Sequence, residues 1–149
     1  PVCYNERMQL RKQAHAVYRT QYHIVWITRY RRKILQHGME EYFKKILQEI
    51  RKFSPELEFI EIGTDLDHVH VHMVIPPKYA VSATIQRIKA NTSSRMKGKF
   101  PYLSKVYWDS RGIWGTGFFV STVGIDEQTI RNYVRQQGEH DAGQLMLEL

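Results

Sequence analysis

The sequence contains a single cysteine, Cys3, among its 149 residues. One cysteine excludes an intramolecular disulfide and a zinc site built from several thiolates. The chain also lacks any apolar run close to the roughly 20 residues of a membrane-spanning helix, and its first residues lack the apolar segment of a secretory signal. We therefore expect a cytoplasmic protein without a membrane partner.

Acidic residues are in deficit. The 15 Asp and Glu are outnumbered by 22 Lys and Arg, which gives a formal net charge of +7 at neutral pH. This excess favours an anionic partner, with nucleic acid as the leading candidate. A hydrophobic content of 42% over this length is enough for one core, so we expect a single domain over residues 1–149, with residues 1–20 as a short helix or an arm.

Apolar periodicity predicts the elements of this domain. Alternating or β-branched segments predict strands at residues 21–29, 56–63, 68–75 and 117–123. Spacings of three and four predict helices at residues 35–53 and 81–96, and a last helix over 125–138 that starts at Asp126 and ends at Gly138, followed by a tail over 139–149. The order predicts a ferredoxin-like, RRM-like α+β domain. Its antiparallel sheet carries helices on one face, and a C-terminal helix follows.

Residues 65–77 read DLDHVHVHMVIPP and place histidines at every second position. Because side chains alternate along a strand, His68, His70 and His72 share one face, while the apolar residues between them face the helices. Neighbours on one face lie about 7 Å apart at Cα, so two imidazoles can bind one ion, whereas three in a row do so poorly. A further ligand must come from elsewhere. Asp65 and Asp67 share the parity of Val69, so we expect them to point away from an ion.

The last predicted helix offers such a ligand. Tyr133 and Gln137 lie one turn apart on the face that also carries Ile130 and Val134. An isolated pair of this kind is in most proteins an interfacial aromatic residue and a residue at its rim. Here the same helix can dock on the open sheet face that carries the histidines.

Several motifs together resemble a known family. The chain contains DHVH at 67–70, a double proline at 76–77, WGTGFFVSTVG at 114–124, IRNYVRQQ at 130–137 and YHIVWITRYRRKIL at 22–35. This combination resembles the single-tyrosine HUH transposases, the TnpA-like enzymes of the smallest bacterial and archaeal insertion sequences. The resemblance covers about Tyr22 to Gln137.

The resemblance implies a function and a site. It implies a DNA transposase that cleaves and rejoins single-stranded DNA through a 5′-phosphotyrosine intermediate, binds hairpins at the element ends and forms homodimers. Tyr133 aligns with the nucleophile, and His68, His70 and Gln137 align with ligands of a divalent metal ion. Mg²⁺ or Mn²⁺ fits the role, although imidazoles also suit zinc. His72 is an additional histidine, which leaves a shifted pair of His70 with His72 as an alternative.

Basic residues form two groups, one after the first predicted strand and one along the second helix. We expect DNA contacts from both; the residues are Arg29, Arg31, Arg32, Lys33, Arg87, Lys89 and Arg95. A solvated charged surface is the competing interpretation for each of them. The competing function is an open-faced RNA-binding module without catalysis, in which the histidine row contacts bases.

Overall fold

A four-stranded antiparallel sheet forms the centre of the molecule. The computed structural model describes residues 10–13, 16–108 and 112–148. The strands follow the order β4–β5–β3–β6 and span Gln21–Ile27 (β3), Glu58–Thr64 (β4), His68–Val74 (β5) and Phe119–Ser121 (β6). Helix α2 (Met39–Phe53) connects β3 to β4, and helix α3 (Val81–Lys99) follows β5. This connectivity confirms the ferredoxin-like α+β fold.

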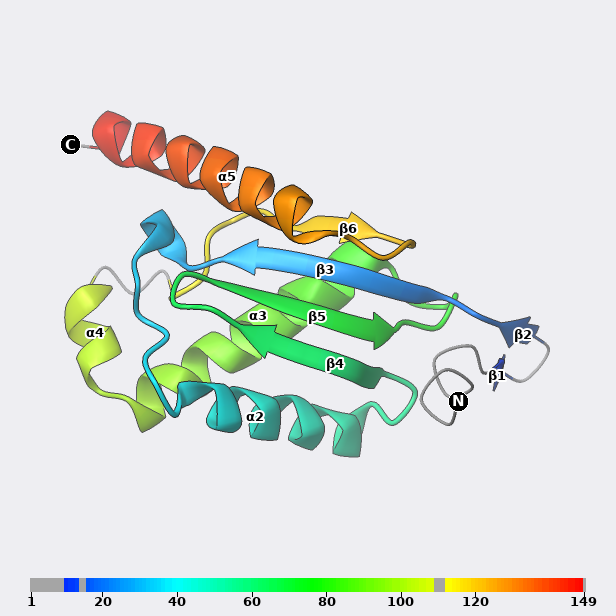
Figure 1. The fold of residues 1–149 in the computed structure, drawn as a ribbon. Coiled ribbons are helices and arrows are strands. Elements are labelled where there is room, and N and C mark those ends of the chain that lie inside the picture. The colour runs from blue at the N-terminus through cyan, green and yellow to red at the C-terminus, as the bar shows by residue number, and fades with distance from the viewer. Residues whose placement is uncertain (1–9, 14–15, 109–111, 149) are drawn as a thin grey trace.

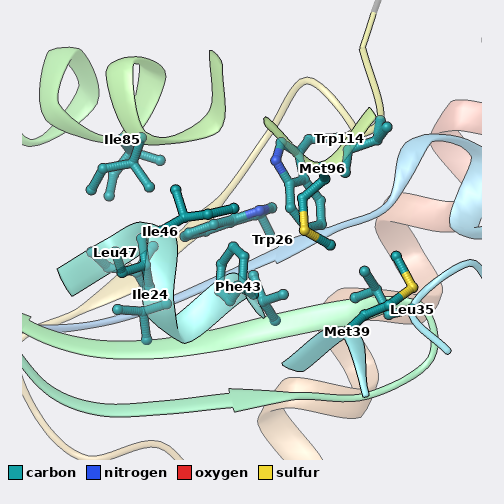
Figure 2. Close-up of a cluster of buried hydrophobic side chains, with 14 of the residues drawn as sticks. Ile24, Trp26, Leu35, Met39, Phe43, Ile46, Leu47, Ile85, Met96 and Trp114 are labelled. Carbon is teal, nitrogen blue, oxygen red and sulfur yellow. The ribbon is translucent and has the colours of Figure 1, made fainter. Parts of the chain in front are cut away.

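Helices α2 and α3 cover one face of the sheet and enclose the main core (Figure 1). Trp26 of β3, Phe43 of α2 and Trp114 meet edge to face at its centre, with ring centroids 5.8–6.4 Å apart. Such tilted aromatic pairs add about 0.5–1.5 kcal/mol beyond the burial of their area. Figure 2 shows aliphatic residues from both helices around these rings.

Helix α2 begins later than predicted. The apolar stripe suggested a start at Leu35, but the helix starts at Met39, after Gly38 with φ of 91°. Leu35 is buried in a segment without regular secondary structure, where its backbone N–H donates to Leu66 O at 3.0 Å. Leu35 is buried but lies outside the helix, and its spacing from Met39 made the apolar stripe look one turn longer than the helix is. The predicted end at Phe53 is confirmed.

Strand β4 does not alternate cleanly, although its sequence suggested that it would. A β-bulge shifts the register between Phe59 and Glu61. Phe59 pairs with Met73 on the core side, whereas Glu61 pairs with His72. The extra residue therefore moves Glu61 from the side of Phe59 to the face that carries the histidines.

Helix α5 (Glu127–Glu148) packs on the opposite face of the sheet, along β3 and β6 (Figure 1). The Oδ1 atom of Asp126 accepts the Thr129 N–H at 2.7 Å, which confirms Asp126 as the N-cap and lowers its pKa. The predicted end at Gly138, with a tail over 139–149, is wrong because the helix continues to Glu148. A glycine inside a helix weakens it by only about 1 kcal/mol, so glycine alone does not end one.

The connections contain three short elements. The N-terminal arm holds a hairpin of β1 (Arg11–Gln13) and β2 (Ala16–Tyr18) instead of a helix, and residues 1–9 of that arm lie outside the described part. A 3-10 turn, η1 (Arg29–Arg31), follows β3, and a short helix, α4 (Tyr102–Val106), follows α3. Within the described ranges, no helix has the length and apolar character needed to cross a membrane.

Candidate active site

The three histidines of β5 lie on the face opposite the main core. Their cross-strand partners on β3 are Ile27 for His68, Val25 for His70 and His23 for His72. The residues between them, Val69, Val71 and Met73, are at most 1% exposed and belong to the core under α2 and α3. The predicted division of β5 into an apolar and a histidine face is therefore confirmed.

His68 is held by a carboxylate. Its Nδ1 lies 2.8 Å from Oδ1 of Asp67, and Oδ2 of Asp67 accepts from Nε of Arg31 at 2.9 Å. The hydrogen bond with His68, supported by Arg31, keeps the pKa of Asp67 below its usual value despite burial. Strand parity did not predict this contact of Asp67 with the ring of His68, because β5 starts at His68 and its alternation does not extend to the residue before it.

His70 presents a buried nitrogen to the open face. Its Nε2 is buried and has no hydrogen-bond partner among the described residues. Opposite it on β4 stands Gly63, where an added Cβ would meet nothing within 4 Å. Burial lowers the pKa of His70, and nearby His23 lowers it further, so the neutral ring that binds metal is favoured.

His72 is in a different environment. Its side chain is buried, with 5% exposure, and its ring stacks on His23 with centroids 4.0 Å apart. Its Nε2 lies 3.1 Å from Oε1 of Gln21, and because a carbonyl oxygen only accepts, Nε2 donates in this bond. That nitrogen is therefore engaged within the protein.

Tyr133 and Gln137 lie over the other half of the sheet. Val134 is buried against Val25 and Ile27, which anchors α5 on β3. The Tyr133 ring lies 5.8 Å from that of Phe119 on β6. A Cβ added at Gly117, just before β6, would lie 2.9 Å from Nε2 of Gln137. The structure thus groups the tyrosine with the glutamine beside β6 and the histidines on β5, with β3 between the two groups.

The sequence reading missed His23 and Gln21 on β3. His23 shares parity with Val25 and Ile27, so strand alternation alone places it on the open face. What the sequence does not supply is the register that sets His23 opposite His72. Only with that pairing do the two rings become neighbours.

Most of the predicted DNA-binding residues have contacts within the chain. Arg29 Nε donates to Gly112 O at 3.2 Å, and Arg32 donates to Val106 O at 2.7 Å while its guanidinium lies over the Tyr30 and Tyr107 rings. Lys89 donates to the carbonyls of Gly115 and Gly117, and Arg95 pairs with Glu49. Lys33 and Arg87 are exposed.

A surface depression gathers part of this charge. It has a volume of about 630 Å³ and lies between α3 and residues 112–116, where Arg29, Lys89 and Lys97 line it. A smaller one, of about 500 Å³, lies between η1 and α5 beside Asp67 and includes Lys33 and Arg135. Both are open surfaces on which an extended anion can lie.

The histidine face offers few donors for a metal ion. In the described ranges, no group of three or more His, Cys, Asp or Glu side chains is arranged to hold an ion. Two histidines adjacent on this face are left: His70, whose buried Nε2 has no partner within those ranges, and His68, whose Nδ1 is directed to a carboxylate. A pair of this kind fits a cation that completes its coordination with an amide oxygen and with substrate or water.

Solved structures of transposases share the fold of this chain. A crystal structure of a candidate transposase from Deinococcus radiodurans superimposes with a TM-score of 0.72 and 26% identity, covering 85% of this chain and 97% of that one. The REP-associated tyrosine transposase, solved bound to a REP hairpin, shares the fold with a TM-score of 0.50 at 14% identity, covering 83% of this chain and 67% of that one.

Sequence comparison agrees. The transposase of insertion sequence IS200 from Salmonella typhimurium is 30% identical over 128 residues, which cover 86% of this chain and 83% of that protein. The ISDra2 transposase TnpA from Deinococcus radiodurans is 27% identical over 135 residues, covering 90% and 94%. The family model for IS200-like transposases matches residues 16–137. The chain therefore belongs to the IS200-like transposase family.

Proposed function

We propose that this transposase cleaves and rejoins single-stranded DNA with Tyr133 as the nucleophile and with one divalent cation, Mg²⁺ or Mn²⁺, held by His68, His70 and Gln137. The observation that carries the proposal is the buried Nε2 of His70, which has no partner in the described part of the chain and lies beside a His68 already oriented by Asp67. A bound cation supplies polarisation of the scissile phosphate and neutralises charge that develops on it.

Tyr133 would perform a transesterification. Its phenolic oxygen attacks the phosphorus and loses its proton, the bond from phosphorus to the 3′ oxygen breaks, and the products are a 5′-phosphotyrosine and a free 3′-hydroxyl. A phenol with a pKa near 10 is a better leaving group than a sugar hydroxyl. The link therefore preserves the energy of the phosphodiester, and a second 3′-hydroxyl can reverse the step to complete strand transfer.

The shifted pair of His70 with His72 has less support than His68 with His70. Nε2 of His72 donates to Gln21, and its ring is stacked on His23. Binding an ion through this nitrogen would require His72 to give up the hydrogen bond to Gln21. His68, in contrast, uses only Nδ1 for Asp67, so its Nε2 remains as the metal-binding nitrogen.

We extend the proposal to a homodimer in which α5 of one copy serves the histidines of the other. In one chain, Tyr133 and Gln137 lie toward β6, which is an edge strand, whereas the histidines lie on β5 beyond β3. Val120 on β6 and Val123 just after it are exposed, at 40% and 69%. An edge strand with exposed apolar residues is suited to pair with a second copy.

The proposed substrate is single-stranded DNA that carries hairpins. The net charge of +7 supports an anionic partner. The depressions lined by Arg29 and Lys89 and by Lys33 and Arg135 offer two surfaces for its backbone. The fold is shared with a transposase that was solved on a hairpin.

A covalent adduct tests this function. Wild-type protein incubated with single-stranded hairpin DNA and Mn²⁺ should give a protein–DNA adduct that survives SDS, and Tyr133→Phe should give none while binding the hairpin normally. Tyr42→Phe, on α2 away from the proposed site, is the matched control and should retain the adduct. If the chain is an RNA-binding module without catalysis, none of the three proteins will form an adduct. An adduct with Tyr133→Phe would show that another residue is the nucleophile.

A further inference from the structure

Three side chains connect η1 to the first histidine of β5. Arg31 donates from Nε to Oδ2 of Asp67 at 2.9 Å, and Oδ1 of Asp67 lies 2.8 Å from Nδ1 of His68. Asp67 is 9% exposed, so its carboxylate is largely shielded from solvent, where hydrogen bonds to charged groups are strong. Its two oxygens are thereby each assigned to a different donor.

The backbone of η1 has an unusual conformation at Arg31, the residue that contacts Asp67. Tyr30 and Arg31 have positive φ values of 59° and 55°, a left-handed backbone that costs about 1–3 kcal/mol for each non-glycine residue. Thr28 holds the turn, since its carbonyl accepts Arg31 N–H at 2.9 Å and its hydroxyl donates to Arg32 O at 2.7 Å. Thr28 N–H also donates to Asp67 O at 2.9 Å, so one residue ties the turn to Asp67.

Helix α5 rests on the same arginine. A Cβ added at Gly138 would lie 2.7 Å from Cδ of Arg31 and 3.3 Å from its Cβ. Only a glycine allows this approach without displacing Arg31. The close contact gives a reason for a glycine inside the helix that carries Tyr133, where it costs about 1 kcal/mol relative to alanine.

We propose that Asp67 is a positioning residue that holds His68 as the Nδ1–H tautomer, with Nε2 free for the metal ion. Arg31 in turn fixes the position of Asp67, and the packing of α5 at Gly138 fixes the position of the Arg31 side chain. The metal part of this inference rests on the proposed function; the tautomer part does not. A neutral imidazole has one N–H and one lone pair. Donation from Nδ1 to a carboxylate therefore leaves the lone pair on Nε2 and makes that nitrogen more basic.

The tautomer can be measured without metal or DNA. Nitrogen-15 NMR of the metal-free protein should show His68 with its proton on Nδ1. Asp67→Ala should shift the population toward the Nε2–H form, whereas Asp65→Ala, at an exposed carboxylate two residues earlier, should leave the spectrum of His68 unchanged. A His68 protonated on Nε2 in the wild-type protein overturns the inference, and this observation requires no variant to fold.

Metal affinity is the second readout. Calorimetric titration with Mn²⁺ should show affinity reduced about 10–100-fold in Asp67→Ala, the usual effect of removing such a partner, and unchanged affinity in Asp65→Ala. Equal affinity in Asp67→Ala and wild type would contradict the positioning role. If the wild-type protein itself shows no Mn²⁺ binding that depends on His68 and His70, the proposed function fails, while the tautomer result is judged on its own.

The contribution of α5 is tested by a pair of glycine variants. Gly138→Ala should displace Arg31, weaken Mn²⁺ affinity several-fold and change the His68 spectrum. Gly98→Ala in α3, where an added Cβ meets nothing within 4 Å, should change neither. Wild-type affinity and an unaltered His68 spectrum in Gly138→Ala would overturn the link between α5 and Arg31.

Discussion

The two faces of the central sheet are formed by the same strands but bury different chemistry. On the face under α2 and α3, residues such as Trp26, Val71 and Met73 are almost fully buried in an apolar core. On the other face of the same strands, His72 is buried, and the buried Nε2 of His70 has no hydrogen-bond partner among the described residues. Burying a polar group without a hydrogen bond costs about 1–3 kcal/mol in proteins.

This contrast separates stability from function within single strands. The apolar face is stabilised mainly by packing, although Nε1 of Trp26 is also buried there without a hydrogen-bond partner among the described residues. The histidine face carries an energetic cost that packing does not explain, which is typical of a site kept for chemistry. Substitutions on the two faces should therefore differ in kind as well as in size.

The largest expected effect is on cleavage by the histidine face. His68→Ala or His70→Ala should abolish metal-dependent cleavage, because each removes one of three protein ligands. Gln137→Ala should be intermediate and partly rescued by added Mn²⁺, since water can replace an amide oxygen. The measurement is cleavage of a hairpin substrate across a metal titration. Activity of His68→Ala together with inactivity of His72→Ala would shift the ligand pair to His70 and His72.

The matching change on the core face should affect stability. Phe43→Ala removes a ring that is 1% exposed and packs against Trp26 and Trp114. We expect the free energy of unfolding to fall by about 3–5 kcal/mol, as measured by urea denaturation. Protein that remains folded should retain metal-dependent adduct formation, and a selective loss of chemistry without loss of stability would show that the two faces are not separable in this way.

His72→Ala should lower stability by less than the core substitution and should leave cleavage in place. The substitution removes the stack on His23 and the bond to Gln21, and we expect a loss of about 1–3 kcal/mol in unfolding free energy, the usual range for buried point substitutions. Cleavage at saturating Mn²⁺ should persist at temperatures where the variant is folded. Thermal denaturation and the adduct assay on the same sample separate a structural histidine from a ligand.

The smallest effect concerns charge. Lys33 is exposed and lines the depression beside Asp67, whereas Lys44 on α2 is paired with Glu40 at 3.2 Å. If Lys33 contacts a phosphate, Lys33→Ala should reduce the slope of log affinity against log salt by about 0.7–0.9, and Lys44→Ala should not change it. Fluorescence anisotropy with a hairpin oligonucleotide measures both slopes, and equal slopes would make Lys33 part of a solvated surface.

Local patterns were enough for much of the fold. Strand alternation predicted which residues of β5 face the core, and the positions of Asp126 and Phe53 predicted where α5 begins and α2 ends. These features depend on backbone periodicity and on hydrogen bonds between residues close in sequence. The bulge in β4 and the continuation of α5 past Gly138 escaped prediction because neighbouring elements, and not local propensity, decide them.

By itself, the sequence determined the ferredoxin-like order of elements, the face of the three histidines and, through its motifs, the family. Only the tertiary structure decided the surroundings of His68 and His72, because the residues that orient Asp67 beside His68 and that bond His72 come from distant segments. Asp67 meets Arg31 across 36 positions, and His72 meets Gln21 across 51. Sequence periodicity cannot predict such pairs, because they form only when strand register and helix docking bring together side chains that are far apart in the sequence.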